Sequence, residues 1–167
     1  SSTGPKAPLK CPLDAWGHMW VWQEGGCALL RARNCTQCTN AGGGWCPATG
    51  TCLQGTSTGP HAGASCPLDS NGHGWIDETQ NCAMLGPMTC RACVNLGQTG
   101  YCPSTALCLV GSSTGPDNGV KCPVNERGLG WSWTDADCSA MQADSCGACV
   151  ATGHGWCPST TACLPLD

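Results

Sequence analysis

The chain has 167 residues, of which 18 are cysteine and 24 are glycine, whereas only 11% are charged and none is phenylalanine. A net charge of -4 with no run of like sign excludes a nucleic-acid footprint and a polybasic membrane patch. So much cysteine is typical of secreted domains too small for an adequate hydrophobic core, so we expect a secreted, extracellular protein. No stretch approaches the roughly 18 apolar residues that a membrane span needs, and the first residues are no signal peptide.

The cysteines recur in three sets of six that share one register. The sets are Cys11, Cys27, Cys35, Cys38, Cys46 and Cys52; Cys66, Cys82, Cys90, Cys93, Cys102 and Cys108; and Cys122, Cys138, Cys146, Cys149, Cys157 and Cys163. The period is 55 residues and then 56, because one residue is inserted before Cys102. We therefore expect a small disulfide-rich fold of three tandem cysteine-knot-like modules, over residues 1–55, 56–111 and 112–167, with short helices and little regular strand.

An even number of cysteines in each repeat predicts three disulfides per repeat and nine in the chain. A repeat of this size has a marginal hydrophobic core without such bonds. Each disulfide typically contributes about 2 to 4 kcal/mol, mainly by restricting the unfolded chain, so reduction should unfold the protein. Six cysteines allow many connectivities, and sequence alone does not choose among them.

Each repeat opens with a small, polar segment rich in turn formers, which predicts a linker. Its Thr-Gly-Pro sequence begins at Thr3, Thr58 and Thr114. Later in each repeat, the segment through the Cys-x-x-Cys pair predicts a helix, because a glycine that can adopt the left-handed conformation follows it. These glycines are Gly42, Gly97 and Gly153. In the third repeat, Thr134 followed by Asp137 predicts a capping box that opens a helix containing Cys138 and Met141.

The second half of each repeat carries a further pattern. It reads Cys35-x-x-Cys38, Gly44-Trp45-Cys46-Pro47 and Cys52 in the first repeat, and Cys146-x-x-Cys149, Gly155-Trp156-Cys157 and Cys163 in the third. This half resembles the plexin-semaphorin-integrin (PSI) module, a small extracellular cysteine knot with a short helix at Cys-x-x-Cys. The chain departs from that family where a cysteine usually stands two residues before the next cysteine, because Gly44, Gly100 and Gly155 occupy the place.

The resemblance implies one disulfide per repeat, from the second cysteine of the Cys-x-x-Cys pair to the last cysteine. These bonds join Cys38 to Cys52, Cys93 to Cys108 and Cys149 to Cys163. The other four cysteines of each repeat stay open, and we favour Cys27 with Cys46 and Cys11 with Cys35. PSI-like modules act as structural wedges or spacers in surface proteins, so the resemblance implies a structural role without catalysis.

The cysteines could instead bind zinc, because four thiolates at this spacing suit a tetrahedral site. Two cysteines per repeat would then have no role, and the recurring histidine, His18 and His73, becomes Leu129 in the third repeat. Disulfides account for all six cysteines, so we expect no metal and no cofactor.

Catalysis is also disfavoured. Hydrolysis needs paired carboxylates or a nucleophile with a base. Asp14 and Asp69 recur, but the third repeat has Asn125, which suits a turn and forfeits acid-base chemistry. His61 and His154 share no register with a nucleophile. We therefore expect that the chain is not an enzyme.

The aromatic residues fall into two groups. Those kept in all three repeats are expected in the core, and they are Trp20, Trp75 and Trp131, and Trp45, Tyr101 and Trp156. Trp22 and Trp133 correspond to Asp77 in the middle repeat, and Trp16 has no aromatic counterpart. These three tryptophans are the better candidates for contact with a ligand such as a sugar ring.

Two kinds of glycosylation site are predicted. Asn34-Cys35-Thr36 is the one N-x-Ser/Thr sequon. Ser/Thr clusters beside proline predict either O-glycosylated stalks or unmodified linkers. The residues concerned are Ser2, Thr3, Ser57, Thr58, Ser113 and Thr114.

The repeats agree at cysteine, glycine and aromatic positions and differ at the polar positions where a shared catalytic site would lie. We therefore expect an extracellular structural component of a stalk, matrix or filament, whose partners are copies of itself or other extracellular proteins. Head-to-tail association would follow if a terminal repeat presents its neighbour's surface to another chain. The alternatives are a carbohydrate- or receptor-binding module that uses Trp16, Trp20, Trp22 and Trp133, and a protease inhibitor, for which no loop stands out.

Overall fold

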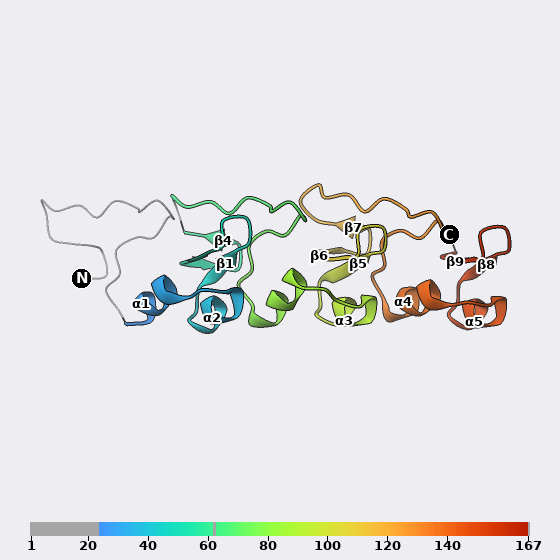
Figure 1. Cartoon of the computed structure of the whole chain (residues 1–167), viewed down its shortest axis with the longest axis horizontal. Coiled ribbons are helices and arrows are strands. Elements are labelled where there is room, and N and C mark those ends of the chain that lie inside the picture. Colours follow the sequence, from blue (N-terminus) through green and yellow to red (C-terminus); the bar gives the residue numbers. More distant parts are fainter. Residues whose placement is uncertain (1–23, 62, 167) are drawn as a thin grey trace, which may run out of the picture. The chain divides into compact units, whose positions relative to one another are not determined.

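The structure is a computed structural model that describes residues 24–61 and 63–166. It confirms a small disulfide-rich fold, in which short helices and small antiparallel sheets are held by seven disulfides among the 18 cysteines. The chain divides into two compact units, one ending at Leu85 and one running from Gly86 to Asp167 (Figure 1). Each unit is described by itself.

In the first unit the helical segments lie on one side of two small hairpins (Figure 1). The helical segments are α1 (Glu24–Arg31), α2 (Cys35–Asn40) and the 3-10 helix η1 (Thr79–Leu85). The hairpins pair β1 (Gly44–Cys46) with β2 (Thr51–Leu53), and β3 (Gly55–Thr56) with β4 (Gly59–Pro60). Trp45 stands opposite Cys52 in the first hairpin.

The second unit also has three helical segments and two small sheets, with five strands in place of four. Its first part holds α3 (Cys90–Val94), β5 (Thr99–Cys102), β6 (Leu107–Ser112) and β7 (Gly115–Pro116), with β6 at the centre of a three-stranded sheet. Its second part holds α4 (Asp135–Gln142), α5 (Cys146–Ala151), β8 (Gly155–Cys157) and β9 (Ala162–Leu164), with β8 antiparallel to β9. Tyr101 and Trp156 stand opposite Cys108 and Cys163, as Trp45 stands opposite Cys52.

The predicted helices are confirmed. The three helices at the Cys-x-x-Cys pairs start after an N-cap side chain that accepts a hydrogen bond from a backbone N–H three residues on, and these caps are Asn34, Thr89 and Ser145. The glycines beyond them, Gly42, Gly97 and Gly153, have φ of 81°, 84° and 80°. The capping box is present too, since the Thr134 hydroxyl accepts from the Asp137 N–H and the Asp137 carboxylate accepts from the Thr134 N–H.

The predicted linkers are wrong where the structure describes them. Thr56 pairs with Gly59 and Ser112 with Gly115, so both openings are tight hairpins. Each hairpin is held by a tryptophan from later in the chain, because the Trp75 Nε1 donates to the Thr56 carbonyl oxygen at 2.8 Å. Residues 1–5, the first opening, lie outside the described residues.

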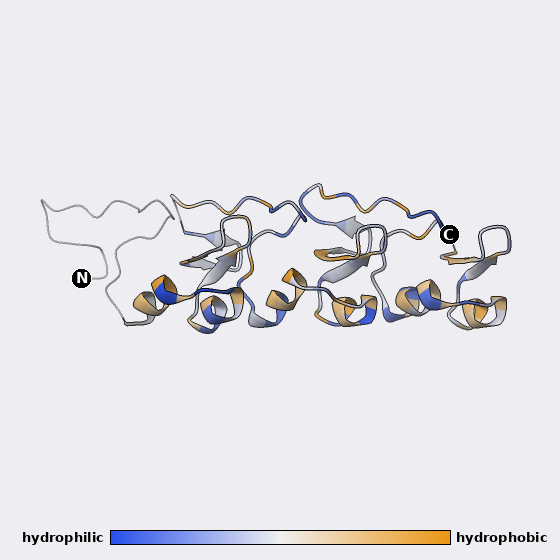
Figure 2. Ribbon diagram, viewed as in Figure 1, coloured by the Kyte–Doolittle hydropathy of each residue, from blue (hydrophilic) through white to orange (hydrophobic). Residues whose placement is uncertain are grey.

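The core is built largely from cysteine. Of the buried hydrophobic residues, about half are cysteines, and the most completely buried ones include Cys38, Cys93 and Cys149. Helices carry hydrophobic residues beside hydrophilic ones, whereas the hairpin strands are mostly of intermediate hydropathy (Figure 2). The disulfides thus occupy the interior that larger side chains fill in bigger domains. Within the described residues no helix is long and apolar enough to cross a bilayer.

Candidate functional site

The seven disulfides are of two kinds. Three close short loops, Cys38–Cys52, Cys93–Cys108 and Cys149–Cys163, which are the pairs that the PSI resemblance implied. Four run from one sequence repeat into the next, and they are Cys35–Cys82, Cys46–Cys66, Cys90–Cys138 and Cys102–Cys122. The second kind defines the candidate site, because each pair of such bonds joins the second half of one repeat to the first half of the following repeat.

These bonds correct the favoured pairing. Cys46 is bonded to Cys66 and not to Cys27, and Cys35 is bonded to Cys82 and not to Cys11. Because partners lie in consecutive repeats, the described residues form seven disulfides, whereas nine were expected for the chain. The expected boundaries at 55/56 and 111/112 consequently fall inside the two compact units, across which the long bonds run.

We call the segment between the two partner cysteines of the later repeat the arm, residues 66–82 in the first unit and 122–138 in the second. Each arm adds a backbone bridge to the edge of a hairpin. Trp45 N–H donates to the Ile76 carbonyl oxygen at 2.7 Å, and Ile76 N–H donates back at 3.0 Å. Tyr101 and Ser132 exchange the equivalent bonds at 2.8 and 2.9 Å. The arm therefore behaves as a short extra strand.

A tryptophan of each arm explains the glycines that depart from the PSI pattern. A Cβ on Gly44 would overlap the ring of Trp75, and a Cβ on Gly100 would overlap the ring of Trp131. The Trp131 Nε1 donates to the Ser112 carbonyl oxygen at 2.8 Å, as Trp75 does to Thr56. Glycine at this position makes room for the tryptophan ring of the next repeat. The sequence offered a signal for this contact, because Gly44 and Trp75 recur in the same register as Gly100 and Trp131.

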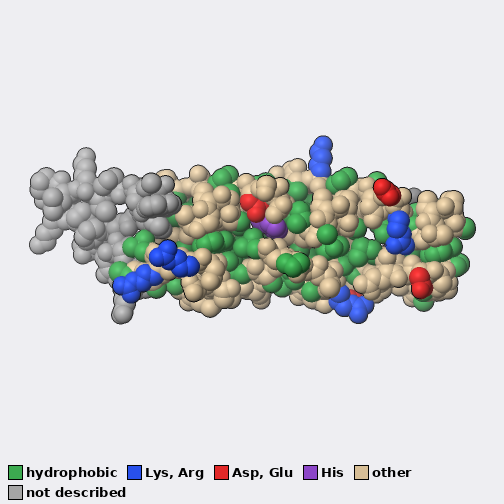
Figure 3. Space-filling view, in the orientation of Figure 1, with side chains coloured by type: hydrophobic (Ala, Val, Ile, Leu, Met, Phe, Trp, Pro, Cys, Tyr) green, Lys and Arg blue, Asp and Glu red, His purple; other side chains and the backbone are tan. Residues whose placement is uncertain are grey.

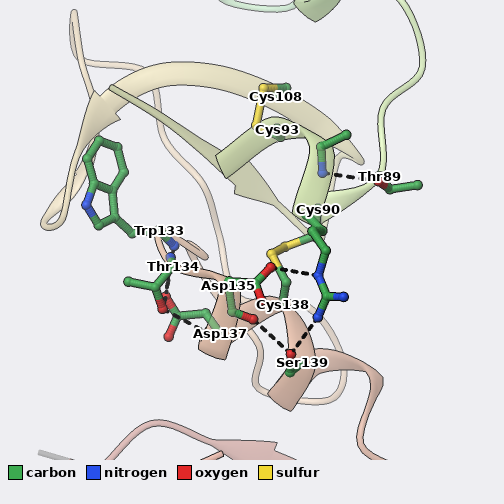
Figure 4. The surroundings of a disulfide bond; sticks show 12 residues. Thr89, Cys90, Cys93, Cys108, Trp133, Thr134, Asp135, Asp137, Cys138 and Ser139 are labelled. Atoms are coloured by element: carbon green, nitrogen blue, oxygen red, sulfur yellow. Dashed lines mark hydrogen bonds and ion pairs between the residues drawn. A yellow bond between two sulfur atoms is a disulfide. The ribbon is translucent and has the colours of Figure 1, made fainter. Parts of the chain in front are cut away.

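Polar contacts surround the bond between Cys90 and Cys138 (Figure 4). Arg91 Nε lies 2.6 Å from Asp135 Oδ1, and Arg91 Nη2 donates to Ser139 Oγ at 3.0 Å. Both charged side chains are more than half exposed, so water screens this ion pair and it contributes little. In the first unit the Thr79 hydroxyl takes the corresponding place and donates to Thr39 Oγ1 at 2.9 Å. The disulfides hold the two repeats together at this junction, and the polar contacts set how the repeats are oriented there.

The helical segment that contains the second cysteine of an arm contacts both an earlier and a later part of the chain. In α4, Cys138 bonds back to Cys90, while Ala140 lies in a buried cluster with Cys149 of α5 and Cys163 of β9. In α1, Leu29 is buried and lies beside Gly43 and Cys52, whereas Cys27 is exposed and forms no disulfide. Cys27 corresponds to Cys138 in the repeat register. α1 therefore lies against the hairpin that follows it, but Cys27 makes no disulfide of the kind that joins Cys138 to Cys90.

The third repeat presents the other half of such a junction. Cys146 is exposed and Cys157 is half-buried, and neither is in a disulfide, whereas their counterparts Cys90 and Cys102 are buried and bonded. No tryptophan lies against Gly155, where a Cβ would meet Leu166 Cδ2 at 3.0 Å and otherwise nothing closer than 3.9 Å. β8 is half-buried throughout, whereas β1 is fully buried.

The Cys157 thiol is also polarised. Its Sγ lies 3.2 Å from Ser159 Oγ. Hydrogen bonds from Ser159 and then Thr160 lower the pKa of Cys157 to about 7. A thiol of that pKa is substantially ionised at neutral pH, and the thiolate is the form that attacks disulfides.

The turn role predicted for Asn125 is confirmed, and Asp69 makes the same kind of turn. Asp69 Oδ1 accepts from the Asn71 and His73 N–H groups, each at 2.8 Å. Asn125 Oδ1 accepts from the corresponding N–H groups two and four residues on, both at 3.0 Å. Burial alone would raise the pKa of Asp69, but the hydrogen bonds from His73 and Asn71 outweigh it and lower that pKa. Asp14 lies outside the described residues.

A cavity of about 230 Å³ in the second unit is lined in part by Ser132, Asp137 and His154. His154 Nε2 lies 3.3 Å from Asp137 Oδ1, and its Nδ1 lies 3.0 Å from the Thr152 carbonyl oxygen. With both ring nitrogens engaged in this way, the histidine has none directed at Ser132. Asp137 meanwhile takes part in the capping box of α4.

The aromatic side chains divide by exposure. Trp45 is buried at 9% exposure, while its counterparts Tyr101 and Trp156 are half-buried. Trp133 is half-buried and stacks on Trp131, with ring centroids 6.3 Å apart. It points away from the disulfide in Figure 4. Trp16, Trp20 and Trp22 lie outside the described residues.

The candidate glycosylation sites that the structure describes are exposed. Asn34 caps α2 through its Oδ1, which accepts from Gln37 N–H at 2.9 Å and leaves the side-chain nitrogen uninvolved. Ser57 and Thr58 form the tip of one hairpin, and Ser113 and Thr114 the tip of the other. Ser2 and Thr3 lie outside the described residues.

Charge and metal ligands add no second site. On the face shown in Figure 3 the ionised side chains are few and mostly isolated. Within residues 24–61 and 63–166, no three His, Cys, Asp or Glu side chains are grouped so that they could hold a metal ion. In comparisons with protein-family models, characterised proteins and solved structures, nothing matches this chain. Function is therefore inferred from the junctions.

Proposed function

We propose that the chain is an extracellular structural protein, a tandem array of three PSI-like repeats joined covalently to one another by paired disulfides. The observation that carries this proposal is the crossing of the repeat boundary by Cys35–Cys82 and Cys46–Cys66, repeated by Cys90–Cys138 and Cys102–Cys122. Two bonds at each junction resist separation of neighbouring repeats, which suits a stalk, matrix or filament. Disulfides at this density are compatible with an oxidising, extracellular compartment.

The bonds are also placed to bear tension. Pulling on the two ends of the chain loads Cys35–Cys82, Cys90–Cys138 and Cys149–Cys163, because the other four bonds lie inside the segments that the first two close. The Cα atoms of Cys35 and Cys82 are 5.6 Å apart across a sequence separation of 47 residues. That segment cannot lengthen while its outer bond is intact.

Single-molecule stretching of the whole chain tests the proposal. Each of the two outer bonds hides roughly 150 Å of contour, at about 3.4 Å per residue. Cys149–Cys163, with a sequence separation of 14, hides roughly 40 Å more, so we expect an oxidised molecule to reach its limit about 350 Å shorter than the same molecule in reductant. Equal extension with and without reductant would show that the junction bonds do not bear load and would remove the structural proposal.

The exposed hairpin tips support a second element of the proposal, O-glycosylation at Ser57, Thr58, Ser113 and Thr114. Glycans there would project from turns that already hold their shape. Mass spectrometry of native material should find heterogeneous hexose-containing mass on these residues; a homogeneous, unmodified mass would remove this element. Quenching of tryptophan fluorescence by millimolar sugar would instead favour the alternative, a carbohydrate-binding module.

A further inference from the structure

We propose that the cavity of the second unit binds a small alcohol that carries a single ring, a molecule about the size of phenol. Ser132 and Asp137 bind its hydroxyl group, and Val124, Leu129 and Ala140 enclose its ring. The inference goes beyond the proposed structural function and does not depend on it.

The cavity has room because two of the side chains that line it are small. Ser132 lies in the arm, and Ala140 lies in α4. The corresponding positions of the middle repeat hold Ile76 and Met84, which are both buried. A repeat of this fold therefore accommodates large apolar side chains at these two positions, and in the third repeat much of their volume is left to the cavity.

The size of the cavity sets the size of the ligand. Its volume is about 230 Å³. A cavity of roughly 150 Å³ lined by apolar side chains is enough to hold a benzene ring. The cavity of the second unit can therefore take one ring together with a substituent.

The Ser132 hydroxyl group is a buried polar group that a ligand can satisfy. Ser132 is 6% exposed, and among the described residues its hydroxyl group forms no hydrogen bond. Its backbone is occupied by the bridge to Tyr101. Trp131 and Trp133 stack on each other, and side chains alternate along an extended segment, so the Ser132 side chain points away from those rings. A hydrogen bond gained by such a buried group favours binding.

Asp137 supplies an acceptor to the same cavity. Its Oδ2 accepts three hydrogen bonds, from the N–H groups of Trp133 and Thr134 and from the Thr134 hydroxyl group (Figure 4). Its Oδ1 has one partner among the described residues, His154 Nε2 at 3.3 Å, and a carboxylate oxygen can accept two hydrogen bonds. A hydroxyl group both donates and accepts, so it matches Asp137 and Ser132 together.

The remaining walls of the cavity favour a ring with few polar groups. Val124, Leu129 and Ala140 contribute apolar side chains. A sugar would bring several hydroxyl groups against these walls, where they would lose water and gain no hydrogen bond. A ring with one hydroxyl group buries its carbon atoms there at no such cost.

An NMR titration of the whole oxidised chain, with ¹³C-labelled leucine methyl groups, tests the site. Phenol is the probe, and toluene is its control because it has the same ring without the hydroxyl group. We expect phenol to shift the Leu129 methyl signals saturably in the millimolar range, and toluene to bind about tenfold more weakly. The methyl signals of Leu30, which is exposed in the first unit, should not move.

Filling the cavity should abolish binding. Ala140→Met places in the cavity the residue that the middle repeat has at this position, so it should weaken phenol binding by about tenfold or more while the seven disulfides remain. Ala151→Met is the matched control, because Ala151 is exposed at the end of α5 and does not line the cavity. It should leave the affinity for phenol unchanged.

A second variant removes one oxygen atom and keeps the cavity open. With Ser132→Ala, phenol should bind about tenfold more weakly than to the wild type, so that phenol and toluene bind equally. Ser139→Ala is the control, because Ser139 is exposed on α4 and lies outside the cavity lining, and it should preserve the difference between the two probes.

Three results would overturn the proposal. The first is that phenol produces no saturable shift at Leu129, or shifts it equally in the wild type and in Ala140→Met. The second is that toluene binds the wild type as tightly as phenol does, because the cavity would then be an apolar space that recognises no hydroxyl group. The third is that glucose shifts Leu129 at lower concentration than phenol, which would make the cavity a sugar site.

Discussion

Trp131 lies against Gly100 so closely that a single methyl group on that glycine would overlap its ring. The two residues belong to consecutive repeats, and the contact lies beside the two disulfides that join those repeats. Packing of a large aromatic ring directly against the backbone of a glycine thus takes the place of the side-chain packing that forms the core of a bigger domain. The same relation holds between Trp75 and Gly44.

Gly100→Ala should therefore destabilise the second unit. Because the ring is hydrogen-bonded through Nε1 and cannot withdraw freely, we expect a loss of about 1 to 3 kcal/mol, the usual range for overpacking. Denaturant unfolding of the oxidised chain measures it. Gly155→Ala is the matched control and should change the free energy of unfolding by less than about 0.5 kcal/mol, because no ring covers that position. Equal losses in the two variants would contradict this account.

The bond between Cys90 and Cys138 should dominate the stability of its junction. It closes a segment with a sequence separation of 48 residues, so replacing both cysteines with alanine should cost about 3 to 4 kcal/mol by freeing the unfolded chain. Thermal unfolding compares this double variant with Cys146→Ala, a change at the position of the third repeat that corresponds to Cys90. The latter should leave the unfolding temperature unchanged, since Cys146 is exposed and unbonded.

The mass change on reduction gives a direct count of the bonds. A monomer with seven disulfides gains two hydrogens per bond, or 14 in all, and alkylation before reduction should label the four cysteines outside those bonds, Cys11, Cys27, Cys146 and Cys157. A gain of 18 would mean that the intra-repeat pairing holds after all. Intact-mass spectrometry of the purified monomer decides between the two counts.

Cys157 should be the thiol whose alkylation responds to pH near neutrality. Its pKa of about 7 means that its rate of reaction with iodoacetamide should reach half its maximum near that pH. Ser159→Ala removes the largest cause of the lowered pKa, so the midpoint of the rate profile should move to higher pH. Peptide mapping after brief labelling assigns the rate to this cysteine. A profile that does not move would show that Ser159 has no influence on the thiol.

Asp137 should make the second unit sensitive to acid. Burial alone would raise its pKa, but the hydrogen bonds from the Thr134 side chain and backbone and from Trp133 N–H outweigh burial and lower it. A folded pKa below the unfolded one stabilises the fold fully above the unfolded value, and the contribution is lost as pH falls through the folded value.

Between about pH 5 and pH 2, the denaturant midpoint of the wild type should therefore fall more steeply than that of Asp137→Asn. At neutral pH the variant should be less stable by about 1 kcal/mol, because it weakens a helix cap. Asp69, whose pKa is also lowered, is present in both proteins, so the difference between their pH profiles isolates Asp137. Parallel profiles would show that the cap does not titrate as described.

The amino-acid sequence by itself determined the local structure of this protein. Periodic cysteines predicted a disulfide-rich fold, and glycines 42, 97 and 153 marked helix ends, because a left-handed backbone is local and favours glycine. The Thr134–Asp137 capping box and the turns at Asp69 and Asn125 are local in the same sense, since each side chain bonds within four residues.

Tertiary structure alone decided how the cysteines that join one repeat to the next are paired. Spacing cannot distinguish a bond within a repeat from the equivalent bond to the next repeat, because the register is the same in both. The choice is made by the arm, which bridges to Trp45 through Ile76 and seats Trp75 on Gly44, bringing Cys66 to Cys46 and Cys82 to Cys35. Segments this far apart meet only when the hairpin they share is formed, so a pattern of single residues could not show that the bonds are shifted by half a repeat.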